Sequence, residues 1–197
     1  MNYQFPEIRS IHDVLPHIEG RSEFIVAERD FGTVINYVVA MADTFDMAGP
    51  DDLGGAIRRE CRGLKFHPDG TIGARPFHKW FNINEREETQ QHVVDLSLPH
   101  VIMEKLDGSM IHPMMVDGNV RWMTKMGITE VALQAEEFVA ENTKYLDFAC
   151  WCITNKLTPL FEWCSRKQKI VIDYPEDKLV LLAVRDNVTG EYLSIRP

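Results

Sequence analysis

The sequence lacks every pattern that would place the protein in or across a membrane. No run among its 197 residues is long and apolar enough to span a bilayer, and its first ten residues, MNYQFPEIRS, have no signal-peptide pattern. Its four cysteines, Cys61, Cys150, Cys152 and Cys164, form no CxxC pair and have no zinc-site spacing. We therefore expect a cytoplasmic protein with reduced thiols and no membrane partner.

Positive charge is also scarce, because 21 Lys and Arg face 30 Asp and Glu, for a net charge of −9. A chain with this balance does not grip nucleic acid with its whole surface. Any nucleic acid must meet a local basic patch, or be bound mainly by another domain or a partner. Hydrophobic residues make up 45% of the chain, which is enough for a core. We expect one domain over residues 1–197, or two tightly packed lobes within it.

Periodicity and turn signals predict an α+β protein with antiparallel β-sheets and inserted helices, and argue against a βαβ fold. A short helix capped by Ser10 comes first, and the polar stretch 44–55 is typical of a loop. Residues 129–155 have helical periodicity, for two helices or for one helix bent near 142–145. Strands are expected at 24–29, 33–41, 60–82 around a turn at 68–70, 111–125 around a turn at 117–118, 158–163, 169–172, 178–184 and 192–195.

The clearest chemical feature is Lys105-Leu106-Asp107-Gly108, which follows the apolar run Val101-Ile102-Met103. We expect that run to be a buried strand that ends at Lys105, with Gly108 permitting a tight turn or the close approach of a ligand. A deprotonated lysine amine is a nucleophile, and Asp107 can hold a metal-bound water or fix the turn. The alternative is a solvated charge at an ordinary turn, because K-x-D-G arises by chance in roughly one chain of this length in twenty.

Two further segments suit the binding of a nucleotide. Residues 57–82 carry six Lys or Arg against two Asp or Glu, interleaved with aromatic residues, which suits a polyphosphate and an aromatic base. An amphipathic hairpin with basic side chains on its wet face is the alternative. Glu162, between Phe161 and Trp163, should meet a cation, a metal or a hydroxyl group if it is buried. Strand alternation equally allows it to face outward.

These segments, in their order along the chain, resemble the motifs of the covalent nucleotidyltransferases, the superfamily of ATP-dependent ligases and capping enzymes. The nearest resemblance is to the phage RNA ligases that repair tRNA. The K-x-D-G motif of that family matches residues 105–108, preceded by Glu104 as in the family. The other matches are Glu60-Cys61-Arg62-Gly63 to an Arg-Gly strand, Lys79-Trp80-Phe81-Asn82 to a Lys-x-Phe-Asn element, Phe161-Glu162-Trp163 to a Phe-Glu-aromatic motif, and residues 179–193 to the motif that follows.

The resemblance implies an RNA ligase that uses ATP and Mg²⁺ to join RNA ends, including those of tRNA. Lys105 would take AMP from ATP as lysyl-AMP, AMP would pass to an RNA 5′-phosphate, and a 3′-hydroxyl group would displace it. Asp107 and Glu162 would hold the metal, and Arg62 and Lys79 would clamp the outgoing pyrophosphate. The residues implied to bind ATP are Arg62, Lys79, Phe81, Glu104, Asp107, Gly108 and Glu162.

The sequence departs from the family after residue 193. The family continues with a Glu-Gly motif, a Lys-x-Lys motif and a helical tRNA-binding domain, and none of these follows before Pro197. We therefore expect the N-terminal part of a nucleotidyltransferase fold, incomplete at its C-terminus, as a fragment, split subunit or truncated product. A second chain would then supply the missing motifs. The alternative functions are a non-catalytic nucleotide- or RNA-binding remnant, or another lysine nucleotidyltransferase such as a DNA ligase or a capping guanylyltransferase.

Overall fold

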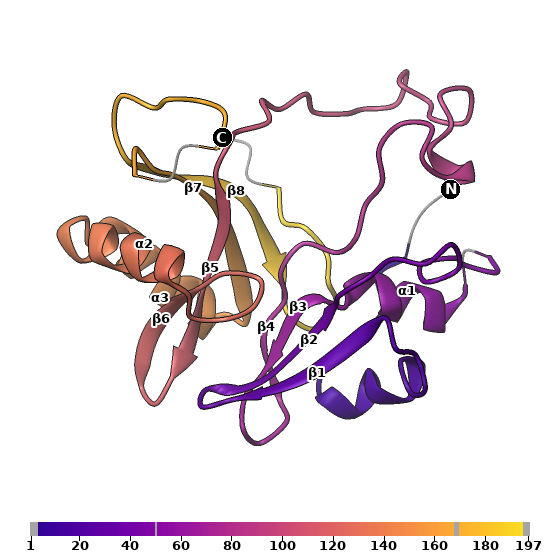
Figure 1. Cartoon of the computed structure of the whole chain (residues 1–197), viewed down its shortest axis with the longest axis horizontal. Coiled ribbons are helices and arrows are strands. Elements are labelled where there is room, and N and C mark those ends of the chain that lie inside the picture. The colour runs from indigo at the N-terminus through magenta and orange to yellow at the C-terminus, as the bar shows by residue number, and fades with distance from the viewer. Residues whose placement is uncertain (1–3, 50, 168–169, 195–197) are drawn as a thin grey trace.

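Two four-stranded antiparallel sheets form the framework of the protein, which confirms the expected α+β class (Figure 1). The computed structural model describes residues 4–49, 51–167 and 170–194. The first sheet has the strand order β1-β2-β3-β4, and the second has the order β6-β5-β7-β8. The strands are β1 Phe24–Arg29, β2 Gly32–Tyr37, β3 Arg62–Phe66, β4 Ile72–Ala74, β5 Ser109–Val116, β6 Asn119–Met123, β7 Leu157–Cys164 and β8 Lys178–Asp186.

Helices on the first sheet differ from the expected ones. The helix expected after Ser10 is two 3₁₀ turns, η1 Ile11–Asp13 and η2 Leu15–His17, because Pro16 has no N–H group with which to continue an α-helix. The loop expected at 44–55 is wrong at its end, where helix α1 (Leu53–Glu60) begins. Asp52 caps this helix by accepting the Gly55 N–H at 2.9 Å.

Helices on the second sheet match the predicted helical stretch. They are α2 (Glu130–Glu141) and α3 (Lys144–Thr154), so the sequence forms two helices and not one bent helix. Both pack on one face of the sheet around a core of buried residues that includes Trp122, Ala135, Ala149, Phe161 and Trp163. In the described part of the chain, no helix has the length and apolar character needed to cross a membrane.

Hairpins are the most accurately predicted strands. The turns at 68–70 and 117–118 join β3 to β4 and β5 to β6 as expected. However, β2 ends at Tyr37 and β4 ends at Ala74, so the strands expected as far as residues 41 and 82 are too long. Residues 170–172 form no strand, and Tyr192 makes one isolated bridge to Arg185; residues 169 and 195 of these expected strands lie outside the described part. Extended residues form a strand only where a neighbouring strand accepts their hydrogen bonds.

A buried group of three charged side chains joins the two sheets. Glu60, at the end of α1, accepts hydrogen bonds from Arg75 Nε (3.1 Å) and from Arg185 Nη2 (2.6 Å), and these three side chains have no exposed area. The remaining guanidinium nitrogens donate to backbone carbonyls. Burial alone would raise the pKa of Glu60, but the guanidinium groups of Arg185 and Arg75 hold it below its usual value. Beside them, Gly190 (φ 77°) leaves no room for a Cβ, which would lie 2.5 Å from Arg75 Cζ.

A buried lysine forms a second connection between the sheets. Lys65, in β3, places its amine 3.0 Å from His112 Nε2 in β5, and donates to the carbonyls of Gly63 (2.9 Å) and Lys125 (3.1 Å). Its side chain has no carboxylate partner among the described residues and no solvent exposure. Burial lowers the pKa of Lys65 to about 7, since no water solvates the charged form.

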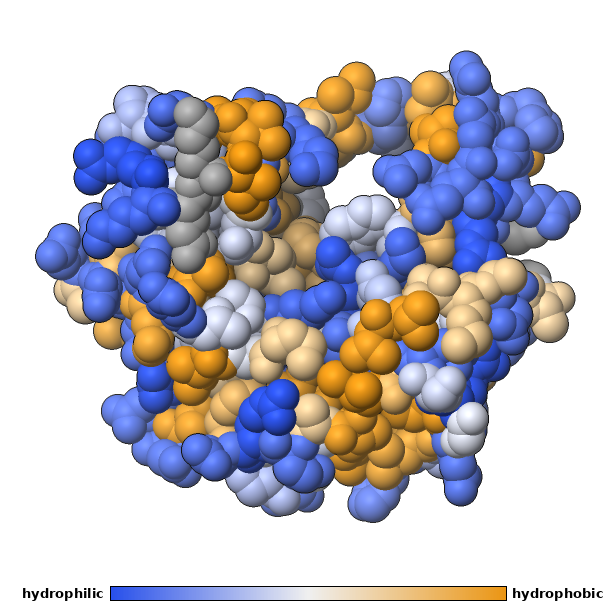
Figure 2. All heavy atoms as spheres, viewed as in Figure 1, coloured by the Kyte–Doolittle hydropathy of each residue, from blue (hydrophilic) through white to orange (hydrophobic). Residues whose placement is uncertain are grey.

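The connection from β4 to β5, residues 75–108, is the longest in the described part of the chain. It arches over the top of the molecule in Figure 1 and reaches from one sheet to the other. Figure 2 shows hydrophobic residues among hydrophilic ones along this arch and an opening beneath it. Its exposed large hydrophobic residues are Trp80, Ile83, Val93, Leu96, Leu98, Val101, Ile102 and Met103.

Glu60→Gln should destabilise the protein strongly, because two buried guanidinium groups would lose their charged partner. Loss of one member of a buried ion pair typically costs about 3–5 kcal/mol of unfolding free energy. Urea denaturation measures the difference. Glu7→Gln is the matched control, because Glu7 and Arg9 form an exposed pair that solvent screens. Equal losses in the two variants would contradict a structural role for the buried group.

Lys65→Met should change how stability depends on pH. In the wild type, Lys65 has a pKa of about 7 when folded and 10.5 when unfolded, so between these values the unfolded chain binds more protons. The free energy of unfolding of the wild type should therefore rise with pH over this window, relative to the variant, and the difference should be constant below pH 7. Denaturation of both proteins from pH 6 to pH 10 tests this, and parallel profiles would contradict it.

Candidate functional site

The residues that precede Lys105 do not have the structure that the sequence suggested. Residues 101–107 form no strand, and the apolar residues 101–103 are exposed, Ile102 by 89%. The expected buried strand before Lys105 is therefore wrong. Strand β5 begins after the motif, at Ser109, where its register with Trp163 of β7 starts. Residues 101–108 pair with no strand in the described part of the chain, and Lys105 itself is exposed.

Asp107 binds the loop between β7 and β8. Its Oδ2 accepts the N–H groups of Val171 (2.6 Å) and Ile172 (2.7 Å), and its own N–H donates to the hydroxyl oxygen of Tyr174 at 2.8 Å. The amide of Ile172, followed by that of Val171, lowers the pKa of Asp107, because both hydrogen bonds stabilise the carboxylate. Asp107 therefore fixes the turn, which is one of the two roles expected for it.

Glu162 lies beside this turn. Its neighbours Phe161 and Trp163 are buried under α2 and α3, and Glu162 is half-buried on the other face of β7. It thus faces away from the aromatic core, as strand alternation allows, but toward Lys105 and Asp107. Burial raises the pKa of Glu162, and the charge of Asp107 adds to this; the hydrogen bond from the Gly108 N–H and the charge of Lys105 act in the opposite direction.

Gly108 is required by a close approach between the turn and β7. A Cβ at this position would lie 2.3 Å from the carbonyl oxygen of Trp163 and 2.9 Å from its carbonyl carbon. Contacts this short do not occur, so a side chain here would push the turn away from the strand. The glycine therefore lets the turn after Asp107 sit directly against the β7 backbone next to Glu162.

A second group of predicted residues surrounds Phe81. Three cations lie near its ring: Lys79 Nζ at 4.5 Å, Arg86 Cζ at 4.8 Å and Arg59 Cζ at 5.1 Å from the centroid. Arg62 lies over the neighbouring Trp80, with Cζ 5.0 Å from the ring centroid. These distances are typical of cation–π contacts. Positive charge and aromatic rings are thus interleaved as the sequence suggested.

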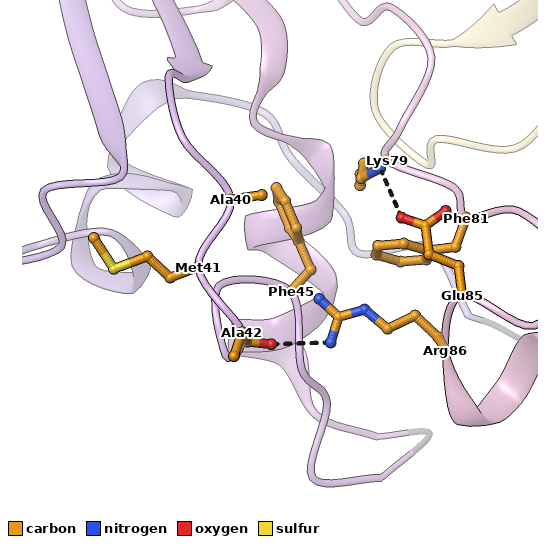
Figure 3. Close-up of a pocket in the computed structure, with 8 residues that line it drawn as sticks. All are labelled: Ala40, Met41, Ala42, Phe45, Lys79, Phe81, Glu85 and Arg86. Carbon is orange, nitrogen blue, oxygen red and sulfur yellow. Dashed lines mark hydrogen bonds and ion pairs between the residues drawn. The ribbon is translucent and has the colours of Figure 1, made fainter.

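The ring of Phe81 helps to line a pocket of about 390 Å³, which we call the Phe81 pocket (Figure 3). Its lining residues are Ala40, Met41, Ala42, Phe45, Lys79, Phe81, Glu85 and Arg86. Lys79 and Glu85 point toward one another in Figure 3, with Nζ and Oε1 3.9 Å apart, and Arg86 donates to the Ala42 carbonyl at 3.0 Å. The pocket is open to a ligand that can compete with Glu85 for Lys79.

Comparison with known proteins identifies the family. The sequence model of the RNA ligase family matches residues 60–196, which include every predicted site residue. This chain belongs to the RNA ligase family. It is 34% identical over 186 residues to "Putative RNA ligase" of Thermovibrio ammonificans, and 26% identical over 196 residues to "RNA ligase 1" of Bacteriophage TS2126. Each match covers 93% of this chain and 47% of the relative, so the chain spans about half the length of these two proteins.

The predicted ligase residues fall into two groups. Asp107, Gly108 and Glu162 lie together where β5 and β7 begin to pair, and the exposed Lys105 belongs to the same turn. Lys79 and Phe81 line the Phe81 pocket, whereas Arg62 lies over Trp80 and is not part of the lining. No hydrogen bond, ion pair or ring contact between described residues joins the two groups directly. Glu104 is exposed and makes no hydrogen bond or ion pair with a described residue.

Sequence reasoning missed several residues that shape these groups. Arg86 adds to the charge around Phe81, where Arg59 of the predicted basic segment also lies. Tyr192, at the end of the matched stretch 179–193, shares a 2.9 Å hydrogen bond with His78 Nδ1, next to Lys79, a contact that the sequence did not indicate. Tyr174 binds the Asp107 N–H. The basic composition of 57–82 signalled Arg59, but nothing in the sequence links Tyr174 or Tyr192 to residues that lie tens of positions away.

The carboxylates at the turn fit a magnesium ion that draws its other ligands from elsewhere. Among the described residues no cluster of three or more His, Cys, Asp or Glu side chains is suited to hold a metal. Asp107 Oδ2 takes both amide hydrogen bonds, so Oδ1 keeps its acceptor capacity, and Glu162 lies alongside. Mg²⁺ usually binds one or two protein carboxylates and completes its shell with water and phosphate oxygens. Asp107 and Glu162 provide that number.

Gly108→Ala should displace the turn from β7. The added methyl group would overlap the Trp163 carbonyl, and overpacking of this kind typically costs about 1–3 kcal/mol of unfolding free energy. Gly49→Ala is the control, since a Cβ at Gly49 meets nothing within 4 Å. Chemical denaturation of both variants measures the costs. A Gly108 variant as stable as the Gly49 variant would show that the turn does not require the close approach.

Proposed function

We propose that this chain is the adenylyltransferase part of an ATP-dependent RNA ligase, with Lys105 as its nucleophile. One observation carries the proposal: in a chain of the RNA ligase family, an exposed lysine lies in the same turn as Asp107, and Gly108 of that turn packs against β7 next to Glu162. The chain would form lysyl-AMP and transfer AMP to the 5′-phosphate of an RNA, whose sealing by a 3′-hydroxyl group releases AMP. The RNA ends of a broken tRNA are one candidate substrate.

In the first step, the lone pair of Lys105 Nζ forms a P–N bond to the α-phosphorus of ATP. The P–O bond to pyrophosphate breaks at the same time, and the amine loses a proton. A lysine attacks only in its deprotonated form, and its side chain must approach in line with the leaving group. The exposure of Lys105 leaves its amine accessible to the nucleotide, and the anchoring of Asp107 to the β7–β8 loop fixes the backbone two residues away.

The Phe81 pocket would take the phosphates that leave. Lys79 in the pocket and Arg62 over the neighbouring Trp80 carry the positive charge suited to pyrophosphate, and the rings of Phe81 and Trp80 hold these cations in place. Phosphate oxygens would replace Glu85 as the partner of Lys79. Since the two groups of residues lie near opposite ends of the connection from β4 to β5, ATP would bridge them, with its α-phosphate at Lys105.

A magnesium ion bound to ATP would offset the negative charge of the phosphates. Asp107 Oδ1 would hold it, and Glu162 would bind it or a ribose hydroxyl group. Gly108 and Glu104 would line the nucleotide site, Glu104 through backbone groups that read the adenine edge. We assign the fold to the nucleotidyltransferase type, with residues 1–197 as the N-terminal portion of one adenylyltransferase domain. The protein would act in the cytoplasm, and the four described cysteines are free thiols.

The length of the relatives favours one alternative. Because the chain spans 47% of each of these proteins, the Glu-Gly and Lys-x-Lys motifs would come from a second chain or from further sequence. Without them, the chain would be a non-catalytic nucleotide- or RNA-binding remnant. A DNA ligase or a capping guanylyltransferase is a weaker alternative, because the family match is to RNA ligases.

Lys105→Ala should abolish covalent labelling of the protein. The chain is incubated with Mg²⁺ and α-labelled ATP, separated by denaturing electrophoresis and compared with Lys144→Ala, which removes an exposed lysine at the start of α3. We expect label on the wild type and the Lys144 variant alone. A parallel reaction with α-labelled GTP separates a ligase from a capping enzyme.

Each outcome of this experiment is informative. Label that persists in the Lys105 variant would remove the proposed nucleophile. If the wild type binds ATP but acquires no label, the remnant alternative holds for this chain by itself, and labelling after addition of the other half of a relative would restore the ligase proposal.

A further inference from the structure

The turn that carries Lys105 has few attachments of its own. Between His100 and Leu106, no backbone hydrogen bond to a described residue holds the chain, and residues 101–105 are exposed. The first attachments appear at Asp107, through its N–H and its carboxylate, and at Gly108, through its contact with β7. The position of Lys105 therefore depends on residues that come after it in the chain and on the loop they bind.

Hydrogen bonds, and not burial, attach that loop to the turn. Val171 is 76% exposed and Ile172 is 42% exposed, so their side chains contribute little packing. Their two amides on Asp107 Oδ2, together with the Tyr174 hydroxyl group on the Asp107 N–H, are the direct polar contacts between the loop and the turn among the described residues. Three hydrogen bonds thus hold two exposed segments together.

Tyr174 is the best anchored of the loop residues. Its hydroxyl group lies near the thiol of Cys164, the last residue of β7. Its ring lies under Lys178, the first residue of β8, with Nζ 5.0 Å from the ring centroid. Cys164 and Lys178 are paired across the two strands. Tyr174 therefore packs against the base of the loop, where β7 and β8 are paired.

We propose that Tyr174 is a positioning residue for Lys105, through the hydrogen bond between its hydroxyl group and the Asp107 N–H. This inference rests on the proposed role of Lys105 as a nucleophile. Tyr174 does not touch the reacting atoms. It holds the backbone two residues after Lys105 at a fixed distance from β7 and β8, so that the amine approaches the α-phosphorus in one orientation. Small displacements of a nucleophile reduce the rate of attack without preventing substrate binding.

Tyr174→Phe tests the proposal, because it removes the hydroxyl group and keeps the ring beneath Lys178. The rate of lysyl-AMP formation at saturating ATP should fall between about twofold and tenfold, the range for one neutral hydrogen bond. The ATP concentration at half-maximal rate should stay the same, since Tyr174 lies at the turn and not at the Phe81 pocket. Tyr145→Phe, in α3, is the control, because the Tyr145 hydroxyl group makes no hydrogen bond with a described residue; it should leave both quantities unchanged.

Amide hydrogen exchange tests the same hydrogen bond without any reaction. In Tyr174→Phe the Asp107 amide should exchange about twofold to tenfold faster than in the wild type. The amides of β5 and β7 should keep their protection. Unchanged exchange at Asp107 would overturn the proposal. If the wild type forms lysyl-AMP, an unchanged rate of its formation in Tyr174→Phe would also overturn the proposal. If the wild type forms no lysyl-AMP, the proposed nucleophile fails by that result, and exchange alone decides whether Tyr174 holds the turn.

Discussion

The salt bridges of Glu60 with Arg75 and Arg185 constrain every other part of the structure. Three charges without solvent are tolerable only if each is paired and hydrogen-bonded, so the two sheets have little freedom to move apart or to slide. Glu60 stands two residues before Arg62, and Arg75 stands four residues before Lys79. The same ion pairs that join the sheets therefore fix the backbone shortly before each of the two cations proposed to bind phosphate. The positions of Arg62 and Lys79 therefore depend on the buried ion pairs of Glu60.

The two groups of site residues are held in contrasting ways. The cations around Phe81 follow elements locked by buried charge, and aromatic rings restrict their side chains. The Lys105 turn is exposed and depends on hydrogen bonds from a loop whose apolar side chains also face solvent. The proposed phosphate contacts are thus held by buried charge and ring packing, and the proposed nucleophile by a few hydrogen bonds two residues away.

The sequence was a reliable guide to chemistry and a weaker one to local structure. The K-x-D-G motif and the basic aromatic segment were recognisable because each combines residue types that chance rarely places together, and the hairpin turns were recognisable from Asp-Gly pairs. Helix α1 was missed because Gly54 and Gly55 lower helix propensity, which the cap at Asp52 and burial of the helix outweigh. The run 101–103 was misjudged because hydrophobicity records what a segment would prefer, and not whether the fold offers it a neighbour. Contacts such as Tyr174 with Asp107 join positions that no local pattern connects.

The glycine at position 190 shows how far the buried charges reach. Its missing side chain leaves the space that the Arg75 guanidinium group fills, and its backbone carbonyl receives Arg185. A mutation that adds even one methyl group at position 190 should destabilise the protein, because the Arg75 guanidinium group must move away and Glu60 then keeps one of its two cationic partners. Positions 60, 75, 185 and 190 are therefore coupled as one unit of sequence variation. Any lineage that replaces this cluster must change several of these residues together, or pass through an intermediate that is close to unfolding.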